Sequence, residues 1–473
     1  MLGFVLSETI PCITISPAGM SSHLKWPSFI LVMMTMASIT LAQVPLDQYQ
    51  ERRVNLLNQV RDGIILLKAK ATEKEMEQWG WIQNAAFYYF TGLGDQPSAI
   101  LVLDGPHQET HLFVPPAPLS FGVPVQNLSQ TPGAESAEAL GLNSVRDWDG
   151  FEAYIEKRME EGITRLYLEK SRRPGPSGNP DGMTAVSGRF LLWEQSVSEA
   201  FPDVEIISIT EKISEMRWVK SEAELKILRS NAAMTSHAMM AGARAIRPGV
   251  FQREVESAVV AGCLESGAQG PSFWPWTMAG PNTHFQHLVR SFYDYNGLNR
   301  KMQSGELVRV DVGCASDYYG GDVGRTIPVS GSFSDEQVKV WNLLVSGYRA
   351  GIDAMQPGMS LDEVREASKA AIRQANQRAG DPNIRTIAES MLDESSGVNW
   401  HIHGVGIESG EAPGPTLETG VVLAYEPMFR WKNDSYYLED MILITGHGAE
   451  ILSNGLPYSA AEIAAALSRT NPY

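Results

Sequence analysis

Cysteine is scarce in this chain, with 3 cysteines in 473 residues. One of them, Cys12, precedes an apolar leader-like segment, which leaves Cys263 and Cys314 for the folded protein. Two thiols allow one disulfide at most and have no zinc-ligand spacing, so a disulfide-dense scaffold and a cysteine zinc site are both excluded. Because both cysteines lie in apolar sequence, the pattern favours two buried free thiols.

Positive charge is also in short supply, because 38 Lys and Arg residues stand against 55 Asp and Glu, a formal net charge of -17. A basic face is the usual mark of phosphate binding, so nothing favours nucleic acid as a partner. The acidic excess is mostly expected to be solvated surface. With 43% hydrophobic and 20% charged residues the composition is typical of globular proteins, and roughly 150 residues per domain predicts two or three domains.

No apolar run reaches the length of a membrane span. The longest, FILVMMTMASITL at 29–41, has 13 residues, follows Lys25, and is typical of the apolar core of a signal peptide. Ala42 offers a cleavage site before Gln43, so we expect residues 1–42 to be a signal peptide and the protein to be exported, either periplasmic or secreted. A buried N-terminal helix is the alternative, disfavoured because unpatterned polar sequence follows.

The first half of the remaining chain, residues 43–215, alternates strand-like and helix-like segments. This alternation predicts a smaller α/β domain, although no cluster of His, Cys or paired acids occurs in it. We therefore expect this half to shape substrate access or to oligomerise. The apolar runs are Gly63–Ala69, Ser98–Leu103, His111–Val114, Arg165–Leu168 and Val204–Ile209, with a helical stretch at Phe151–Glu161.

The second half, residues 216–473, contains a repeated pattern. Capping boxes at 221–224 and 334–337 each open a long helical stretch. Each stretch ends at a Pro-Gly turn, in RPGVFQREV and in QPGMSLDEV, whose Pro-Gly pairs lie 109 residues apart. This recurrence predicts an internal duplication of helix, turn and helix, each copy followed by strands.

Two strand pairs follow the two copies and carry acids in apolar sequence. If the first is a hairpin centred on Ser316-Asp317, Asp311 lies opposite Asp322. If the second is centred on Lys432-Asn433, Glu426 lies opposite Glu439. Like charges opposed in a sheet destabilise it, and bound cations would remove that repulsion. The pattern therefore predicts a cage for two divalent metal ions.

An imidazole is available for the same cage. The segment HIHGVG, residues 401–406, places His403 on an extended, glycine-flanked stretch between the two acidic strand pairs. His401 lies two residues earlier, so in an extended strand both rings point to the same side.

These motifs resemble a known family. The block VRVDVGCASDYYGGDVGRT, the segment HGVGIESGE, and then AYEP and LEDMILIT are similar to the pita-bread metallopeptidases, which include aminopeptidase P (Xaa-Pro aminopeptidase), prolidase and methionine aminopeptidase. The order Asp, Asp, His, Glu, Glu fits. NAAFYYFTGLGDQPSAILVLD resembles the N-terminal domain of aminopeptidase P and prolidase. The resemblance implies a C-terminal pita-bread (creatinase-like) domain with pseudo-two-fold duplication, preceded by the smaller α/β domain.

The resemblance also implies roles for the five side chains. Asp311 would bind one metal ion, Asp322 and Glu439 would bridge both, and His403 and Glu426 would bind the other. A water between the ions would be the nucleophile, and Glu426 would shuttle its proton to the leaving amine. Mostly oxygen ligands with one nitrogen favour Mn²⁺, with Zn²⁺ or Co²⁺ as alternatives.

The residues expected around the substrate depart from the family pattern. His287 matches a family histidine that contacts substrate, with His284 as the competing candidate. Histidine is usual where Gly410 stands and common where Asn399 stands, and arginine is common where Tyr437 stands. His401 is therefore a candidate substitute for a lost substrate-binding histidine, and with Glu426 and His287 it completes the predicted catalytic set.

The resulting hypothesis is an exported Xaa-Pro aminopeptidase-like metallopeptidase acting on peptides with proline at the second position, as a homo-oligomer (dimer or tetramer) without a stable membrane span. A prolidase-like Xaa-Pro dipeptidase is the second candidate. A catalytically weakened peptide-binding homologue is the third, because Gly410 replaces an expected donor. A changed specificity also stays open through Gly410 and the aromatic stretch at 273–276.

Overall fold

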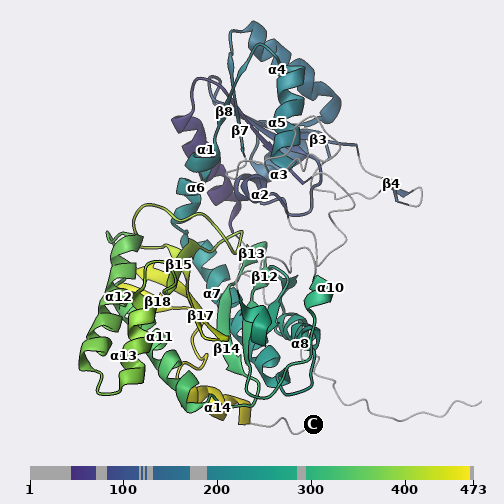
Figure 1. Cartoon of the computed structure of the whole chain (residues 1–473). Coiled ribbons are helices and arrows are strands. Elements are labelled where there is room, and N and C mark those ends of the chain that lie inside the picture. Colours follow the sequence, from purple (N-terminus) through teal and green to yellow (C-terminus); the bar gives the residue numbers. More distant parts are fainter. Residues whose placement is uncertain are drawn as a thin grey trace, which may run out of the picture. The chain divides into compact units, whose positions relative to one another are not determined.

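The computed structural model describes residues 44–70, 83–116, 119–120, 123–124, 131–170, 189–284 and 295–468 (Figure 1). The predicted signal peptide and His287 lie outside these ranges. Within them, no helix combines the length and the apolar character that crossing a bilayer requires.

A first sheet is built from residues 64–208. Its strands are β1 (Ile64–Lys68), β2 (Ile100–Asp104), β3 (Glu109–Val114), β6 (Ser144–Asp147), β7 (Arg165–Leu168) and β8 (Glu205–Ser208). They lie in the order β6-β3-β2-β1-β7-β8, with β1 antiparallel to β2 and parallel to β7. Each of the five predicted apolar runs contains a strand. β6 was not predicted, because its sequence SVRD has one buried side chain and no apolar run.

Helices cover both faces of this sheet, which is why its strands are apolar at successive positions. They are α1 (Leu46–Gln59), α2 (Ala85–Thr91), α4 (Phe151–Glu160) and α5 (Arg189–Ala200). Leu66 packs with Phe151 and Val197 of α4 and α5. Its neighbour Leu67 belongs to the opposite core, with Leu56 of α1.

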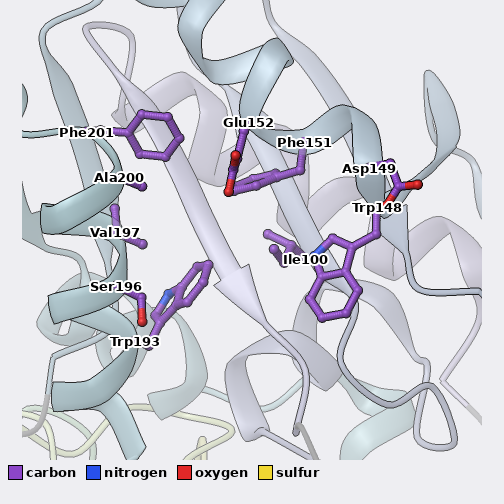
Figure 2. Close-up of a pocket in the computed structure, with 10 residues that line it drawn as sticks. All are labelled: Ile100, Trp148, Asp149, Phe151, Glu152, Trp193, Ser196, Val197, Ala200 and Phe201. Carbon is purple, nitrogen blue, oxygen red and sulfur yellow. The ribbon is translucent and has the colours of Figure 1, made fainter.

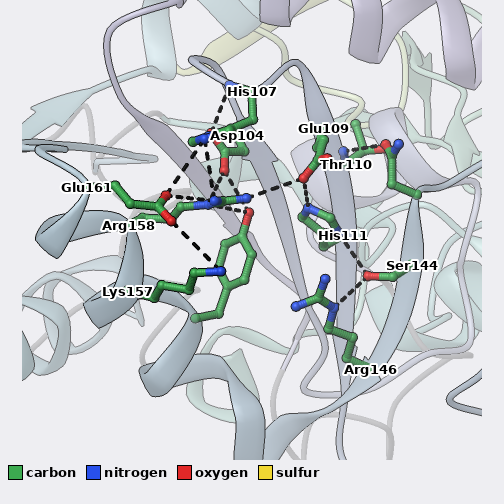
Figure 3. A network of polar contacts seen from close by, with 12 residues as sticks. Asp104, His107, Glu109, Thr110, His111, Ser144, Arg146, Lys157, Arg158 and Glu161 are labelled. Atoms are coloured by element: carbon green, nitrogen blue, oxygen red, sulfur yellow. Dashed lines mark hydrogen bonds and ion pairs between the residues drawn. The ribbon is translucent and has the colours of Figure 1, made fainter.

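A polar network joins this sheet to α4 (Figure 3). Asp104 is fully buried and accepts a hydrogen bond from Tyr154 Oη at 2.7 Å, while Arg158 Nε lies 2.7 Å from its carboxylate. Burial opposes ionisation, but hydrogen bonds from Tyr154 and His107 outweigh it and lower the pKa of Asp104. The sequence showed no cluster of His, Cys or paired acids here. The fold gathers acids around Arg158, whose guanidinium neutralises them.

A second sheet is built from residues 276–451. Its strands are β10 (Trp276–Ala279), β11 (Leu307–Val312), β14 (Val323–Pro328), β15 (Asn399–Gly404), β16 (Val422–Trp431), β17 (Asp434–Thr445) and β18 (Gly448–Ile451). Six follow the order β10-β11-β14-β17-β16-β15, and β18 pairs with β17. All of these pairings are antiparallel.

Two helix pairs pack on this sheet and repeat as predicted. They are α7 (Glu222–Ala245) with α8 (Gln252–Glu265), and α11 (Asp335–Ala354) with α12 (Leu361–Arg378). Both predicted capping boxes form, at Ser221 and Ser334. The Pro-Gly turns place Gly249 at φ +88° and Gly358 at φ +93°, a region that glycine occupies without strain. In Figure 1, α11 and α12 lie together with α13 (Pro382–Leu392) beside the yellow strands.

The remaining elements are short connections. The helices are α3 (Ala134–Leu140), α6 (Thr210–Trp218), α10 (Tyr295–Leu298) and α14 (Ala460–Ser468), with single 3₁₀ turns at Trp148–Gly150 and Gly280–Thr283. The strands are β4 (Leu119–Ser120), β5 (Val123–Pro124), β9 (Gly270–Pro271), β12 (Cys314–Ser316) and β13 (Tyr319–Gly320).

The two predicted acidic hairpins have different outcomes. In the first, Asp311 lies opposite Gly324, so the predicted pairing of Asp311 with Asp322 is wrong. The turn falls at Asp317-Tyr318, both at positive φ, one residue later than predicted. Because moving a hairpin turn by one residue moves every partner by two, this shift accounts for the new register.

The second hairpin turns at Lys432-Asn433 as predicted, because Trp431 pairs with Asp434. The pairs Tyr425–Asp440 and Met428–Tyr437 on either side set the register. This register places Glu426 opposite Glu439.

The prediction of two free thiols is also wrong, because Cys263 and Cys314 form a disulfide with a Cα–Cα distance of 5.5 Å. Both residues are fully buried, as their apolar surroundings indicated. The packing of α8 against β9, which pairs with β12, brings the two sulfurs together across 51 residues of sequence. Such proximity is a property of the fold that sequence spacing does not carry.

Candidate metal centre

Five side chains from five neighbouring segments form the candidate site. Asp311 comes from β11, Asp322 lies directly before β14, His403 is on β15, Glu426 on β16 and Glu439 on β17. Side chains alternate along each strand, so the ligand candidates on the strands can share one face of the sheet, opposite the face on which the helices pack. The antiparallel order β11-β14-β17-β16-β15 sets them side by side.

Two overlapping sets of ligand atoms converge at His403. Asp322, His403 and Glu439 form one set, and His401, His403 and Glu426 form the other, with the ligand atoms of each set within 4.8 Å of one another. His403 Nε2 lies 3.4 Å from Glu426 Oε1, 3.7 Å from Asp322 Oδ2 and 3.8 Å from Glu439 Oε1. The imidazole is thus surrounded by three carboxylates.

The ring of His403 is oriented for ligation. Its Nδ1 lies 3.0 Å from the carbonyl oxygen of Gly404, so a proton on Nδ1 leaves Nε2 free toward the carboxylates. This second hydrogen bond is the usual arrangement of a metal-binding histidine. His401 lies on the same face of β15, with a ring-centroid distance of 5.4 Å, as the alternation of strand residues predicts.

The carboxylates are buried and repel one another. Burial, and then the charges of neighbouring carboxylates, raise the pKa values of Asp322 and Glu439 well above their usual range. For Glu426, burial is outweighed by hydrogen bonds from His401 and His403, and its pKa is lowered. Burial opposes protonation of His403, yet its contact with Glu426 and the charge of Asp322 raise its pKa to about 9. An oxygen-rich donor set of this charge, with one oriented imidazole, fits divalent cations.

Asp311 is held differently from the other four. Its Oδ2 accepts a hydrogen bond from Arg309 Nη2 at 2.9 Å, and among the residues that the structure describes it belongs to neither convergent set. It still lies close enough for its charge to raise the pKa of Asp322. Burial raises the pKa of Asp311 itself, against the effect of Arg309.

A cavity of about 360 Å³ adjoins the centre. It exposes residues from both acidic hairpins, including Arg309, Met428 and Tyr437, and its wall also contains His284 and Asn399. His284 Nε2 lies 3.2 Å from the carbonyl oxygen of Asn433. The cavity wall therefore contains Asn399 and Tyr437, two positions that differ from the family pattern. It also contains His284, the candidate histidine that lies within the described residues.

Comparison with known proteins matches two family models to this chain. Residues 226–446 match the model of metallopeptidase family M24, and residues 49–167 match the aminopeptidase P N-terminal domain. Residues 226–446 thus form a metallopeptidase family M24 domain, preceded by an aminopeptidase P N-terminal domain. The predicted family resemblance and enzyme class are thereby confirmed.

One curated relative matches nearly the whole length of the chain, and another matches about half of it. The chain is 25% identical over 450 residues to a Xaa-Pro aminopeptidase of Haemophilus influenzae, covering 89% of this chain and 97% of the relative. A Xaa-Pro dipeptidase of Pyrococcus furiosus is 27% identical over 256 residues, covering 53% and 67%. A solved structure of a putative aminopeptidase P from Bacillus anthracis superposes with TM-score 0.71 at 24% identity, covering 89% and 97%, and shows the same pita-bread fold. The chain is thus similar over nearly its whole length to a Xaa-Pro aminopeptidase and over about half of it to a Xaa-Pro dipeptidase.

A second cavity, of about 420 Å³, lies among the N-terminal elements and is lined by Trp148, Phe151, Trp193 and Phe201 (Figure 2). Its acids, Asp149 and Glu152, belong to neither set of convergent ligand atoms in the described part of the chain. The convergent ligand atoms found in the described residues therefore lie at the second sheet.

Sequence reasoning missed Arg309 at the M24 centre. Arg309 stands two residues before Asp311 in one strand, so the alternation that placed the acids on one face also places this guanidinium there. The contact between His401 Nδ1 and Glu426 Oε1 was also not predicted from the sequence. That contact follows from the pairing of β15 with β16, in which His401 lies opposite Glu426.

Proposed function

We propose that this chain is an exported dinuclear peptidase that hydrolyses the Xaa-Pro bond at the N-terminus of peptides. The observation that carries the proposal is the convergence of His403 with three buried carboxylates in an M24 chain. Asp311, Asp322, His403, Glu426 and Glu439 would hold two divalent ions, and this oxygen-rich set favours Mn²⁺. When bound, such ions lower the pKa of water and polarise the scissile carbonyl.

Glu426 is placed to move the proton. Its Oε1 lies between His401 Nδ1 and His403 Nε2, so the carboxylate is fixed by two imidazoles. The His401 side chain is 49% exposed, whereas that of Glu426 is 11% exposed. A proton taken up by Glu426 can therefore pass toward the solvent-facing ring or the leaving amine, which is the role of a general base that becomes a general acid.

Aminopeptidase action is favoured over dipeptidase action. The Xaa-Pro aminopeptidase of Escherichia coli covers 90% of this chain and 98% of its own length, like its Haemophilus counterpart. The dipeptidase relatives from two Pyrococcus species each cover 53% of this chain. The N-terminal domain match at 49–167 adds to the aminopeptidase interpretation.

Export is supported by the disulfide between Cys263 and Cys314, since disulfides persist in oxidising compartments. A homo-oligomer remains part of the proposal, with light scattering of the purified protein as its test.

Hydrolysis assays test the proposal. The protein loaded with Mn²⁺ is expected to release the first residue of Xaa-Pro-Yaa tripeptides, to act poorly on Xaa-Ala-Yaa, and to lose activity with a chelator. Preferential cleavage of Xaa-Pro dipeptides would favour the prolidase alternative. A metal-loaded protein that binds proline peptides without cleaving any would favour the weakened peptide-binding homologue, for which Gly410 is the motivating feature.

Replacing His401 with glutamine is expected to lower kcat by about 10²–10³-fold, because it removes an oriented donor beside Glu426. Metal content should fall little, since Asp322, His403 and Glu439 converge without His401. Steady-state kinetics and elemental analysis of the dialysed protein measure the two quantities.

The matched control is His447→Gln, which alters an exposed histidine in a turn. It should leave both quantities unchanged. A His401→Gln variant with parental kcat would remove His401 from the catalytic set.

A further inference from the structure

A buried cation lies within the carboxylate cluster. The Arg309 side chain is 7% exposed and extends from β11 on the same face as Asp311. Burying a guanidinium is costly unless its charge and its hydrogen-bonding atoms have partners. The partners that Arg309 has are therefore informative.

The contacts of Arg309 are with the metal-ligand candidates and the cavity wall. Its Nη2 lies 2.9 Å from Asp311 Oδ2 and 3.9 Å from Glu426 Oε2. Its Nη1 lies 3.1 Å from Met428 Sδ, and its Nε has no hydrogen-bond partner among the described residues. The only carboxylate hydrogen-bonded to Arg309 in the described chain is thus that of Asp311.

The guanidinium of Arg309 stacks on the ring of Tyr437. The Arg309 Cζ lies 3.7 Å from the centroid of the Tyr437 ring, a close cation–π contact. The Tyr437 hydroxyl donates to Glu439 Oε2, which fixes the ring. A Cβ on Gly324 would lie 1.9 Å from the ring, so the glycine opposite Asp311 is what makes room for it.

We infer that Arg309 is a positioning residue of the metal centre. Its guanidinium stacks on Tyr437 and donates a hydrogen bond to one carboxylate oxygen of Asp311, so that the other oxygen faces the cation site. This inference rests on the proposed dinuclear centre. Because Arg309 binds Asp311 and not the set of Asp322, His403 and Glu439, it acts on one of the two ion positions. The ion held through His403 forms its site without Arg309, whereas the ion that needs Asp311 depends on it.

Metal titration of Arg309→Met tests the inference, because methionine keeps an apolar side chain over Tyr437 and removes the guanidinium that binds Asp311. Equilibrium dialysis with Mn²⁺ is expected to show two ions per parental chain. In the variant, one ion should bind with near-parental affinity and the other at least about 10-fold more weakly, a typical loss when an outer partner of a ligand is removed. The absorption spectrum of the Co²⁺-loaded protein gives a second readout of the altered position.

An exchange variant separates positioning from general destabilisation. The double change Arg309→Tyr with Tyr437→Arg keeps the stacked pair and brings the guanidinium from β17, where position 437 already reaches both Glu439 and Asp311. Compared with Arg309→Met, this double variant should restore part of the affinity for the weakened ion and part of kcat. KM should change little. Arg309→Gln, which keeps the side-chain stem over Tyr437 and a polar end but removes the positive charge and the guanidinium, serves as a milder variant if Arg309→Met does not fold.

The outcomes are distinguishable. Parental affinity for both ions in Arg309→Met overturns the role of Arg309 and leaves the proposed function intact. A folded Arg309→Gln variant used in its place is expected to weaken the same ion, and parental affinities there overturn the inference equally. A parental chain that binds a single ion, or none, overturns the dinuclear proposal itself and the inference with it.

Discussion

Replacing Asp322 with asparagine is expected to remove at least one divalent ion per chain and to lower kcat by at least about 10³-fold. Asp322 lies directly before β14, 3.7 Å from His403 Nε2, in the set whose ligand atoms converge without His401. Asparagine keeps the shape but supplies a neutral amide, so the site loses a charge that holds the cations. Elemental analysis after dialysis and peptide hydrolysis measure the two effects.

The same variant should be at least as stable as the parent in the presence of a chelator. Without cations, Asp322 is one of several buried carboxylates that repel one another, and removing its charge relieves that repulsion. Thermal unfolding with a chelator measures this. Asp362→Asn is the matched control, because its side chain is 90% exposed and bound to Arg365. Unchanged metal content in Asp322→Asn would refute its role as a ligand.

Replacing Glu411 with glutamine is expected to lower the free energy of unfolding by about 3–5 kcal/mol, because it leaves the buried Lys220 without a counter-charge and removes one of the two carboxylates that bind Arg217. Glu411 is 7% exposed; its carboxylate binds Arg217 and lies 2.9 Å from Lys220 Nζ. These contacts tie the segment before α7 to the chain that follows His403. Urea unfolding at neutral pH measures the loss.

The pH dependence of this effect has a definite sign. Burial opposes ionisation of Glu411, but Arg217 and Lys220 outweigh it and lower its pKa from 4.5 to about 2. A lowered folded-state pKa means that the stabilisation is complete above 4.5 and is lost as pH falls toward 2. A difference of this size corresponds to about 3 kcal/mol, so parent and Glu411→Gln should converge in stability across that window.

Glu366→Gln is the matched control for Glu411. Glu366 also binds an arginine, Arg373, but the side chains are 58% and 47% exposed. A solvent-exposed pair contributes little, so this variant should stay within about 0.5 kcal/mol of the parent. A Glu411 variant that behaves like this control would show that the buried network contributes no more than a surface ion pair.

Local signals predicted much of the fold. The apolar runs found the strands of the first sheet except β6, and the capping boxes at Ser221 and Ser334 form as expected. Glycine and proline marked the turns between the paired helices. These features depend on residues a few positions apart, which is why one chain without a structure reveals them.

Contacts between distant segments were predicted less well. The first acidic hairpin is shifted because its two-residue turn falls at Asp317-Tyr318, and polarity alone did not distinguish these residues from Ser316-Asp317. The polar network around Arg158 gathers residues from β2, β3 and α4, none of which is unusual by itself. In both cases the partner of a residue is chosen by packing.

The sequence alone therefore determined the metal-ligand candidates, because the order and spacing of Asp311, Asp322, His403, Glu426 and Glu439 are local to recognisable strands. Only the tertiary structure decided which other residues contact these candidate ligands. The sheet order sets Arg309 against Tyr437 and His401 against Glu426, and the packing of α8 closes the disulfide. Ligands are identified by chemistry carried along the chain, whereas their partners are selected by distances between strands that the chain order does not encode.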